Sequence, residues 1–496
     1  MYASGRRTGP TPSRLTTRRS PSTPASSTRS GARSASSRGR GARAHPMPSP
    51  QSLRVSFRTF GCKLNQAETE SLAASFAAAG ALVVGSGEPA DVVVFNTCTV
   101  TSKAEQKARR EMRLALRLNP DAVAVVTGCY AELEPEAVAA VAPRAVVVPG
   151  SRKDGVRAMA AGLVAAGLEG LDLLDESRRL AARAMGREPD PFGFVAGDAR
   201  FHSRVQLKIQ DGCDNRCAYC RVCLARGRSV SLPPNEALRR AAALESAGVP
   251  EAVLTGVNLS QYRYGGVDLP GLLGLLVAGT SSMGFRVSSY EPDRVDEAFV
   301  RAFALPRVRP HLHLSIQSGS DRVLAAMGRR YGRDAVLRAA EAVRAVRDDP
   351  FIGADIILGF PGEGDDDFRG TVDLLERLEP AWVHAFTYSP RPGTRAWDMK
   401  PRVPERVAVE RAAIVQAIAE RGRAAFASRR VGRVVDAVVE DHGSVGPVLA
   451  TSADYMKLRL LEAPPGFRGA CSCSVLSAIT ARPSESSPDL VASFIS

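Results

Sequence analysis

The chain has 496 residues, of which 44% are hydrophobic, so it is long enough for two or three domains with buried cores. Its longest apolar stretch, residues 269–279, is too short and too interrupted by glycine to cross a membrane, which favours a soluble, cytoplasmic protein. Nine cysteines without a signal-peptide core indicate a reducing compartment and metal or redox chemistry rather than a disulfide framework.

The net charge of +14 is concentrated at the N-terminus. Residues 1–46 contain ten arginines and no acidic residue, which leaves +4 for the rest of the chain. A mildly basic body is compatible with an RNA substrate but does not demonstrate one. The segment mixes Ser, Thr, Pro, Gly and Arg without apolar periodicity, and we predict a disordered extension. Its composition also suits an organellar transit peptide, but the excess of Arg over Lys, typical of a GC-rich genome, favours a start of translation at Met47.

Residues 51–165 alternate short apolar runs with helical stretches, which predicts an N-terminal open parallel α/β sheet. A cysteine follows each of three expected strands: Cys62, Cys98 and Cys129 after residues 54–59, 91–95 and 122–126. Because the carboxyl ends of neighbouring parallel strands converge on one crevice, we expect the three thiols to meet there. Each could be an ordinary small buried residue, but three at equivalent positions favour a three-ligand iron-sulfur site.

Two asparagines lie within a turn of these cysteines. Asn65 and Asn96 could donate hydrogen bonds to cluster sulfide, although both are also ordinary helix-capping residues. Residues 166–199 follow, and we interpret them as a linker.

A second group of cysteines lies on one short loop. Cys213, Cys217 and Cys220, with Tyr219 before the third, supply three thiolates to a four-iron cluster and leave its fourth iron without a protein ligand. An open iron can chelate S-adenosylmethionine and pass an electron into its sulfonium, releasing a 5'-deoxyadenosyl radical. This spacing resembles that of the radical S-adenosylmethionine superfamily. Cys223 leaves two alternatives open, a four-ligand zinc site and a closed electron-transfer cluster.

Residues 200–430 predict a central partial (β/α)6 barrel, whose active site lies at the carboxyl ends of the strands. At this face the resemblance implies contacts to the cofactor from Tyr219, Gly256, Glu291, Gln317 and Asp355, each of which is also a plausible turn or capping residue. Arg226 and Arg228 could bind a cofactor carboxylate or a substrate phosphate, or lie solvated on the surface. The expected strands are 204–209, 252–254, 285–288, 311–316, 351–358 and 382–388; His311 and His313 alternate on one of them, so at most one faces the barrel interior.

The C-terminal part begins with a long helix expected over residues 404–430. Short alternating strands over residues 431–481 then predict a small β-barrel that resembles the TRAM domain, which implies RNA binding. Its four basic and five acidic side chains give a net charge of −1, so charge does not support that role. Tyr455 with Phe467 is a candidate stacking face, Cys471 and Cys473 are interpreted as free thiols, and residues 482–496 are expected to be a disordered tail.

Taken together, the motifs resemble the methylthiotransferases, radical enzymes that insert a CH3S group at an unactivated carbon. The resemblance implies that Cys62, Cys98 and Cys129 hold an auxiliary [4Fe-4S] cluster that delivers sulfur, and that Cys213, Cys217 and Cys220 hold the cluster that cleaves S-adenosylmethionine. It implies two molecules of this cosubstrate. The segments that carry the resemblance are 61–66, 96–100, 127–130 and the Cys213 loop. Two residues depart from the family pattern: Cys223 stands where the family has proline, and Val230 stands where it has arginine.

Residues 61–70 resemble the branch that modifies C2 of N6-threonylcarbamoyladenosine at position 37 of tRNA, beside the anticodon. This implies two partners, the anticodon stem-loop of tRNA and an electron donor such as flavodoxin or ferredoxin. Two relatives remain as alternatives: enzymes of the family that act on isopentenyladenosine in tRNA or on a ribosomal protein. An alternative of another class is a non-catalytic RNA-binding protein with structural metal.

Overall fold

A computed structural model of the protein describes residues 52–142, 144–167, 170–193, 203–441, 448–464, 467, 469–479 and 489–495. They belong to one unit, residues 48–496. The expected N-terminal extension, residues 1–46, lies outside the described residues. Within the described ranges no helix is long and apolar enough to cross a membrane.

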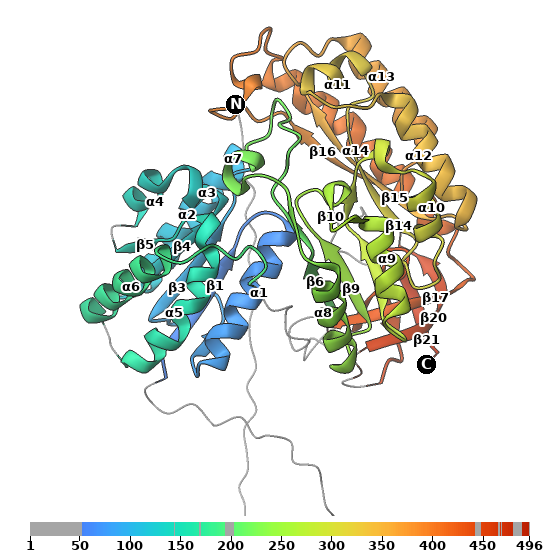
Figure 1. The fold of residues 1–496 in the computed structure, drawn as a ribbon. Coiled ribbons are helices and arrows are strands. Elements are labelled where there is room, and N and C mark those ends of the chain that lie inside the picture. The colour runs from blue at the N-terminus through green and yellow to red at the C-terminus, as the bar shows by residue number, and fades with distance from the viewer. Residues whose placement is uncertain are drawn as a thin grey trace, which may run out of the picture. The chain divides into compact units, whose positions relative to one another are not determined.

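The N-terminal part is a parallel five-stranded sheet in the order β2-β1-β3-β4-β5, drawn in blue and green in Figure 1. Helices cover both of its faces. Val92 and Val94 of β3 pack with one helical layer, whereas Val93 and Phe95 pack with the other, which explains why the strand is apolar at every position. The strands are β1 (Arg54–Thr59), β2 (Leu82–Val84), β3 (Val92–Thr97), β4 (Val123–Gly128) and β5 (Ala145–Val147). The helices are α1 (Lys63–Ala78), α2 (Ser102–Leu118), α3 (Cys129–Leu133), α4 (Pro135–Val141) and α5 (Lys153–Ala166).

The linker expected over residues 166–199 is wrong for its central part. Residues Gly170–Met185 form helix α6, which packs against α5 and contributes to the core of the first domain. Leu173, Leu174 and Ala181 recur at helical spacing and are buried, so the segment has one apolar face that must be covered.

The central part is the expected barrel, built from two parallel sheets in the orders β12-β9-β6 and β13-β14-β15-β16 (Figure 1). Phe285 of the first sheet forms an isolated parallel β-bridge with Val308, which precedes the second sheet's strand at His311. The two sheets share one apolar core. All six expected strands are present: β6 (Arg204–Lys208), β9 (Glu251–Thr255), β12 (Gly284–Val287), β14 (His311–Gln317), β15 (Phe351–Leu358) and β16 (Trp382–Thr387). Short strands are β13 (Ser289–Tyr290) and the antiparallel pairs β7 (Gln210–Asp211) with β8 (Val230–Ser231) and β10 (Arg263–Tyr264) with β11 (Val267–Asp268).

Helices connect the barrel strands, as parallel pairing requires. They are α7 (Val222–Arg226), α8 (Pro234–Ser246), α9 (Leu269–Ala278), α10 (Glu297–Phe303), α11 (Asp321–Met327), α12 (Arg333–Val346), α13 (Asp365–Leu378) and the long α14 (Glu405–Ser428). The stretch 269–279, the most apolar of the chain, is therefore α9, which buries four leucines in the barrel core.

The C-terminal part is a closed barrel in the order β17-β18-β19-β21-β20. Its strands are β17 (Val434–Asp441), β18 (Val448–Ser452), β19 (Lys457–Leu461), β20 (Gly469–Ala478) and β21 (Leu490–Phe494). The tail expected to be disordered from residue 482 is thus wrong for residues 490–494, because β21 pairs with both β19 and β20 and closes the barrel. This strand has only five residues, and it pairs on one side with β20 and on the other with β19.

The C-terminal barrel shares its core with the central barrel. Phe351 and Trp382, at the beginnings of β15 and β16, pack with Phe426 of α14 and with the inward-facing residues of the small barrel.

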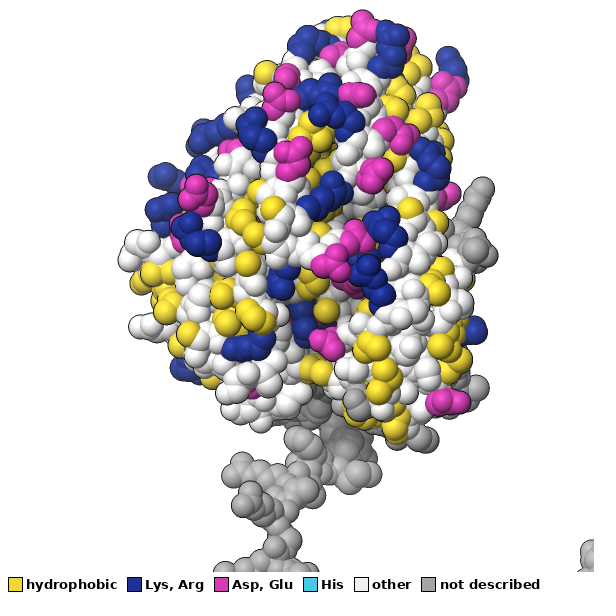
Figure 2. Space-filling view, turned by 90° about the vertical axis from the view of Figure 1, so that its right-hand side faces the viewer, with side chains coloured by type: hydrophobic (Ala, Val, Ile, Leu, Met, Phe, Trp, Pro, Cys, Tyr) yellow, Lys and Arg dark blue, Asp and Glu magenta, His cyan; other side chains and the backbone are white. Residues whose placement is uncertain are grey.

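Figure 2 views the side of the molecule that lies at the right in Figure 1, and Lys and Arg are interspersed there with Asp and Glu instead of forming one basic patch. Electrostatics therefore single out no RNA-binding surface on this face.

Candidate active site

The first three cysteines lie at the ends of three neighbouring strands. Cys62 is the N-cap residue of α1 and lies two residues after Phe60, which follows β1 directly. Cys98 follows β3 directly, and Cys129 begins α3 after β4. Since β1, β3 and β4 are adjacent in the sheet, the three thiols lie at one edge, as the sequence predicted.

Two glycines allow these turns to approach one another closely. Gly61 and Gly128 have φ values of +96° and +99°, in the left-handed region. A Cβ atom on Gly61 would lie 2.5 Å from Cβ of Cys98 and 2.6 Å from its Sγ, and one on Gly128 would lie 2.3 Å from the carbonyl oxygen of Thr97. Any side chain at either position would therefore push the cysteine turns apart.

Cys98 is the most buried thiol of this group. Burial raises the pKa of Cys98 to about 12; the amide of Val100, 3.4 Å from Sγ, opposes the shift, whereas the neighbouring thiols of Cys129 and Cys62 add to it. Three thiols close enough to influence each other's ionisation form a donor set suited to an iron-sulfur cluster, whose binding must displace their protons.

The second group of cysteines lies on the loop between β7 and α7. Gln210 holds this loop through hydrogen bonds from Nε2 to the carbonyl oxygens of Asp211 and Gly212, at 2.9 and 2.7 Å. Gly212, with a φ of +68°, passes so close to the carbonyl of Arg228 that a Cβ atom would overlap it. Cys213 is anchored in turn by the carbonyl oxygen of Gly227, 3.1 Å from its amide nitrogen.

Hydrogen-bond donors point at all three sulfur atoms of this loop. Arg329 Nη1 lies 3.2 Å from Sγ of Cys217, the amide of Val222 lies 3.4 Å from Sγ of Cys220, and Asn258 Nδ2 lies 3.9 Å from Sγ of Cys213. Such donors stabilise thiolates and tune the potential of a cluster that they ligate. The residues present therefore fit a three-thiolate cluster.

A buried ionic network joins the two cysteine groups. Arg226 of α7 donates to both carboxylate oxygens of Asp211, at 3.0 and 3.1 Å, and to both of Glu68 on α1, at 3.0 and 3.1 Å. Lys153 of α5 and Lys208 of β6 also pair with Glu68. Arg226 is thus saturated by protein partners, and not free for the carboxylate or phosphate that the sequence analysis considered. Arg228, in contrast, is exposed and lies 3.7 Å from Asp214.

A cavity of about 270 Å³ is lined by residues of both the sheet domain and the barrel. Val100 and Thr101, just past Cys98, line one side; Cys220 and its neighbour Tyr219 line another. Gln317 and Asp355 contribute the polar wall on the barrel side, and Ile357, Phe386 and Tyr388 contribute the apolar wall. A molecule in this cavity would touch elements that carry both groups of cysteines.

The five expected cofactor contacts are divided between several environments. Tyr219, Gln317 and Asp355 line the cavity described above, and Gln317 has a positive φ of 74°. Glu291 lines a second cavity of about 400 Å³ with Asn215 and Arg329, which donate to its Oε1 at 2.6 and 3.0 Å. Gly256 lines neither; a Cβ atom there would lie 2.7 Å from Oε1 of Gln210, so close packing of Gln210 already accounts for this glycine.

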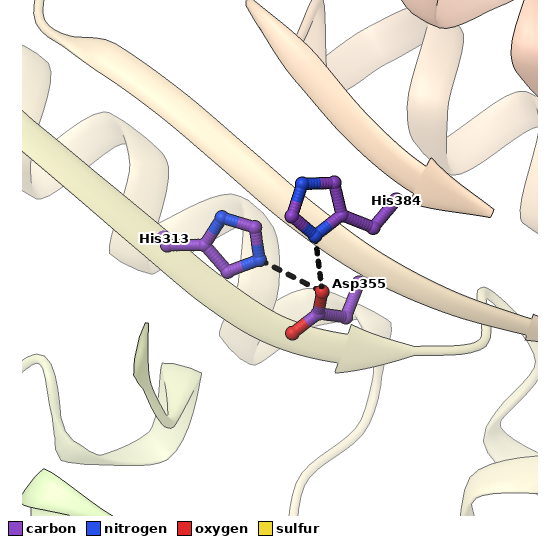
Figure 3. Close-up of side chains that lie close together, drawn as sticks. All are labelled: His313, Asp355 and His384. Carbon is purple, nitrogen blue, oxygen red and sulfur yellow. Dashed lines mark ion pairs between the residues drawn. The ribbon is translucent and has the colours of Figure 1, made fainter. Parts of the chain in front are cut away.

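Asp355 is paired with two histidines from the neighbouring strands (Figure 3). His313 Nε2 lies 2.9 Å and His384 Nδ1 lies 3.2 Å from the same oxygen, Oδ1. Burial raises the pKa of Asp355, but the charge and hydrogen bond of His313 and the hydrogen bond of His384 outweigh it and leave the pKa lowered. His311, two residues earlier on β14, packs instead against Tyr455, with the rings tilted and their centroids 4.5 Å apart.

Several residues of the site were not found from the sequence. Arg329 lies in an ordinary polar turn after α11, and Glu68, Lys153 and His384 are isolated in the sequence from their partners. Tyr455, considered as a base-stacking residue, packs against His311 and Phe351 and accepts a hydrogen bond from Lys63 at 3.2 Å. It therefore belongs to the junction of the domains instead of forming a stacking face with Phe467, whose ring packs on Phe494.

The barrel with its three-cysteine loop defines a radical S-adenosylmethionine enzyme, and comparisons with known proteins give the same class. Residues 54–150 match the family model described as uncharacterized protein family UPF0004, and residues 207–375 match the radical SAM superfamily. A threonylcarbamoyladenosine tRNA methylthiotransferase of Treponema pallidum is 43% identical over 82% of this chain and 94% of its own. A second one, from Thermotoga maritima, is 34% identical over 81% of this chain and 90% of its own.

A third relative carries another name. The tRNA-2-methylthio-N(6)-dimethylallyladenosine synthase of Novosphingobium aromaticivorans is 32% identical over 80% of this chain and 88% of its own. These relatives extend across both cysteine-bearing domains. The chain belongs to the radical S-adenosylmethionine methylthiotransferase family.

Proposed function

We propose that the protein inserts a methylthio group at C2 of N6-threonylcarbamoyladenosine at position 37 of tRNA, with two [4Fe-4S] clusters and two molecules of S-adenosylmethionine. The observation that carries this proposal is the shared cavity. Cys220 lines it from the barrel, while Val100 and Thr101, which follow Cys98 by two and three residues, line it from the sheet domain. In this proposal, one substrate bound in the cavity lies between the element that carries the radical source and the element that carries the sulfur source.

In this proposal Cys213, Cys217 and Cys220 hold the radical cluster, and Cys62, Cys98 and Cys129 hold the auxiliary cluster. When bound, these groups supply the electron that cleaves S-adenosylmethionine and the sulfur that is transferred. Arg329 orients the first site because it donates to Cys217 and pairs with Glu291. Tyr219 and Gln317 shape the wall on which the cofactor and base are held, while Gly256 allows Gln210 to fix the cluster loop.

The choice of base rests on the relatives. Two named for threonylcarbamoyladenosine are 43% and 34% identical, against 32% for the relative named for dimethylallyladenosine. The cavity lining combines the polar Gln317, Asp355, Thr101 and Ser389 with the apolar Ile357, Phe386 and Tyr388, so it does not by itself distinguish a hydrophilic substituent from an isoprenoid one. We further propose contact with the anticodon stem-loop through the C-terminal barrel, a flavodoxin or ferredoxin as electron donor, and a cytoplasmic location, where thiols stay reduced.

The decisive experiment is mass spectrometry of tRNA nucleosides from a deletion strain complemented with variants of this chain. The wild-type gene should restore 2-methylthio-N6-threonylcarbamoyladenosine. Cys98→Ala and Cys217→Ala should not, but only Cys98→Ala should still release 5'-deoxyadenosine when the purified protein is reduced with a flavodoxin. Cys223→Ala is the matched control and should retain both activities.

Three results would contradict the proposal. An unchanged level of the threonylcarbamoyl product in the deletion strain would reject the substrate. Appearance of a methylthiolated isopentenyladenosine, or of a modified ribosomal protein, would favour one of the other family activities. Zinc in place of iron, without cleavage of S-adenosylmethionine, would indicate a non-catalytic RNA-binding protein.

A further inference from the structure

Three ligand-type side chains converge from three adjacent strands of the central barrel. His313 lies on β14, Asp355 on β15 and His384 on β16, and Figure 3 shows all three pointing toward one another. Asp355 and His384 are direct cross-strand partners, whereas His313 is opposite Gly353. A Cβ atom on Gly353 would lie 2.6 Å from Nδ1 of His313, so the missing side chain is what lets this imidazole cross the strand and reach Asp355.

The distances from the two imidazole nitrogens to the Asp355 oxygen are close to the spacing of ligands around one metal ion. Ligands at about 2.1 Å from a cation, separated by angles between octahedral and tetrahedral, lie roughly 3.0–3.4 Å apart. His313 Nε2 and His384 Nδ1 lie 2.9 and 3.2 Å from Asp355 Oδ1, and all three atoms lie within 4.8 Å of one another. Little movement is needed to replace the two hydrogen bonds by bonds to a cation.

The side chains are held in place and yet remain accessible. His384 packs edge-on against Trp382 and Phe386, and the two imidazole rings are 5.1 Å apart. The exposed fractions of the His313, Asp355 and His384 side chains are 12%, 22% and 29%. Asp355 also lines the cavity that contains Cys220, so a bound cation could be reached from there.

We propose that His313, Asp355 and His384 form a binding site for one divalent first-row transition cation, with its remaining coordination positions open to the barrel cavity. Two imidazoles and one carboxylate are the donor set of non-haem iron and of catalytic zinc sites, both of which leave open positions. The site is separate from both cysteine groups and contains no sulfur. It also gives Asp355 a role other than the cofactor contact that the sequence analysis expected.

The test uses Zn²⁺ as the probe on full-length protein whose two cysteine groups are already loaded with iron and sulfide, so that those thiols do not compete. Equilibrium dialysis should show one zinc ion per chain. Its X-ray absorption should show a shell of nitrogen and oxygen at about 2.0–2.1 Å and no sulfur shell at about 2.3 Å. Absence of zinc uptake, or zinc bound by sulfur, would overturn the proposal, and the three side chains would then form only a hydrogen-bonded set.

Variants assign the site to these residues. His313→Gln, His384→Gln and Asp355→Asn should each weaken zinc binding at least tenfold, and the double histidine variant should abolish it. His311→Gln is the matched control, because it removes an imidazole from the same strand that faces Tyr455; it should bind zinc as the wild type does. Unchanged zinc affinity in the double variant would overturn the assignment. This inference does not rest on the proposed function, because zinc binding and nucleoside analysis are measured separately.

Discussion

Arg226 Nη2 donates a hydrogen bond of 2.7 Å to Oδ1 of Asn65, and so ties the helix after the Cys213 loop to the turn that carries Cys62. Asn65 in turn donates from Nδ2 to the carbonyl oxygens of Phe60 and Thr97, at 2.8 and 3.1 Å. Phe60 precedes Cys62 by two residues, and Thr97 immediately precedes Cys98. The guanidinium of Arg226 and the amide of Asn65 therefore link the two cysteine groups, beside the ion pairs of Glu68.

We expect Arg226→Lys to uncouple radical formation from product formation. A lysine ammonium cannot reproduce the planar fork that reaches Asp211, Glu68 and Asn65 together. Both clusters should assemble, and cleavage of S-adenosylmethionine should persist, but the methylthiolated nucleoside formed per 5'-deoxyadenosine should fall about 10- to 100-fold. Arg228→Lys, on the exposed side of the same segment, should leave that ratio unchanged. An unaltered ratio in Arg226→Lys would show that Arg226 does not position the sites.

The carboxylate of Glu68 should be a major contributor to the stability of the domain junction. Burial raises the pKa of Glu68, but Arg226, Lys153 and Lys208 outweigh it and hold the pKa well below its ordinary value. Glu68→Gln removes the carboxylate partner of buried Lys153 and leaves Asp211 alone to balance Arg226 and Lys208, which we expect to cost about 3–5 kcal/mol and to lower the thermal unfolding transition. Because the pKa of Glu68 is lower in the folded than in the unfolded state, the stabilisation by its carboxylate is present above pH 4.5 and is lost as the pH falls through the lowered pKa.

Glu88→Gln is the control for this prediction. Its carboxylate is exposed and lies 3.8 Å from Arg54, so its loss should change stability by less than about 0.5 kcal/mol. If Glu68→Gln unfolds at the same temperature as Glu88→Gln, the network is not a source of stability.

The parts of the fold that were predicted are those with local signals. Strands β3 and β4 are buried and largely apolar, whereas barrel strands such as β6 and β14 alternate apolar with polar residues, and both patterns can be found from the sequence. The cysteines at the ends of β1, β3 and β4 could be assigned to one edge because parallel topology brings such ends together, whatever the side chains between them.

The parts that were missed depend on partners far away in the sequence. Arg226 and Glu68 are 158 residues apart, and no local sequence pattern around either residue indicates that the other is its partner. His384 is an isolated histidine until the register of β15 and β16 places it opposite Asp355. Helix α6 was missed because polar residues dominate its composition. Strand β21 was missed because its five residues form a strand through their pairing with β19 and β20.

Tyr455 should ionise at an unusually low pH. Burial raises its pKa, but the positive charges of Lys63, Arg204 and Arg286 outweigh this and lower the pKa of Tyr455 to about 8. The difference in tyrosinate absorbance between wild type and Tyr455→Phe should therefore titrate near pH 8, and stability from the phenolate should grow between pH 8 and the ordinary pKa of 10.0, then stay constant.

A lysine variant tests the cause of this shift. Lys63→Met should move the titration of Tyr455 back toward higher pH, because Lys63 donates to its hydroxyl oxygen and is the strongest of the lowering charges. Lys103→Met removes an exposed lysine from α2 and should leave the titration unchanged. A midpoint that does not respond to Lys63→Met would assign the shift to the arginines alone.

Removing residues 489–496 should open the C-terminal barrel. The deletion strips β21 from between β19 and β20 and leaves two unpaired edges, which favour association between chains. It also removes Asp489, whose carboxylate accepts two hydrogen bonds from buried Arg423 at 2.8 and 2.6 Å, so Arg423 would remain as an uncompensated charge costing about 3–5 kcal/mol. Size-exclusion chromatography should show aggregation, and limited proteolysis should cut within residues 434–478. Deletion of Ser496 alone keeps every pairing of β21 and should leave a monodisperse, protected barrel; equal behaviour of the two truncations would mean that β21 is dispensable for closure.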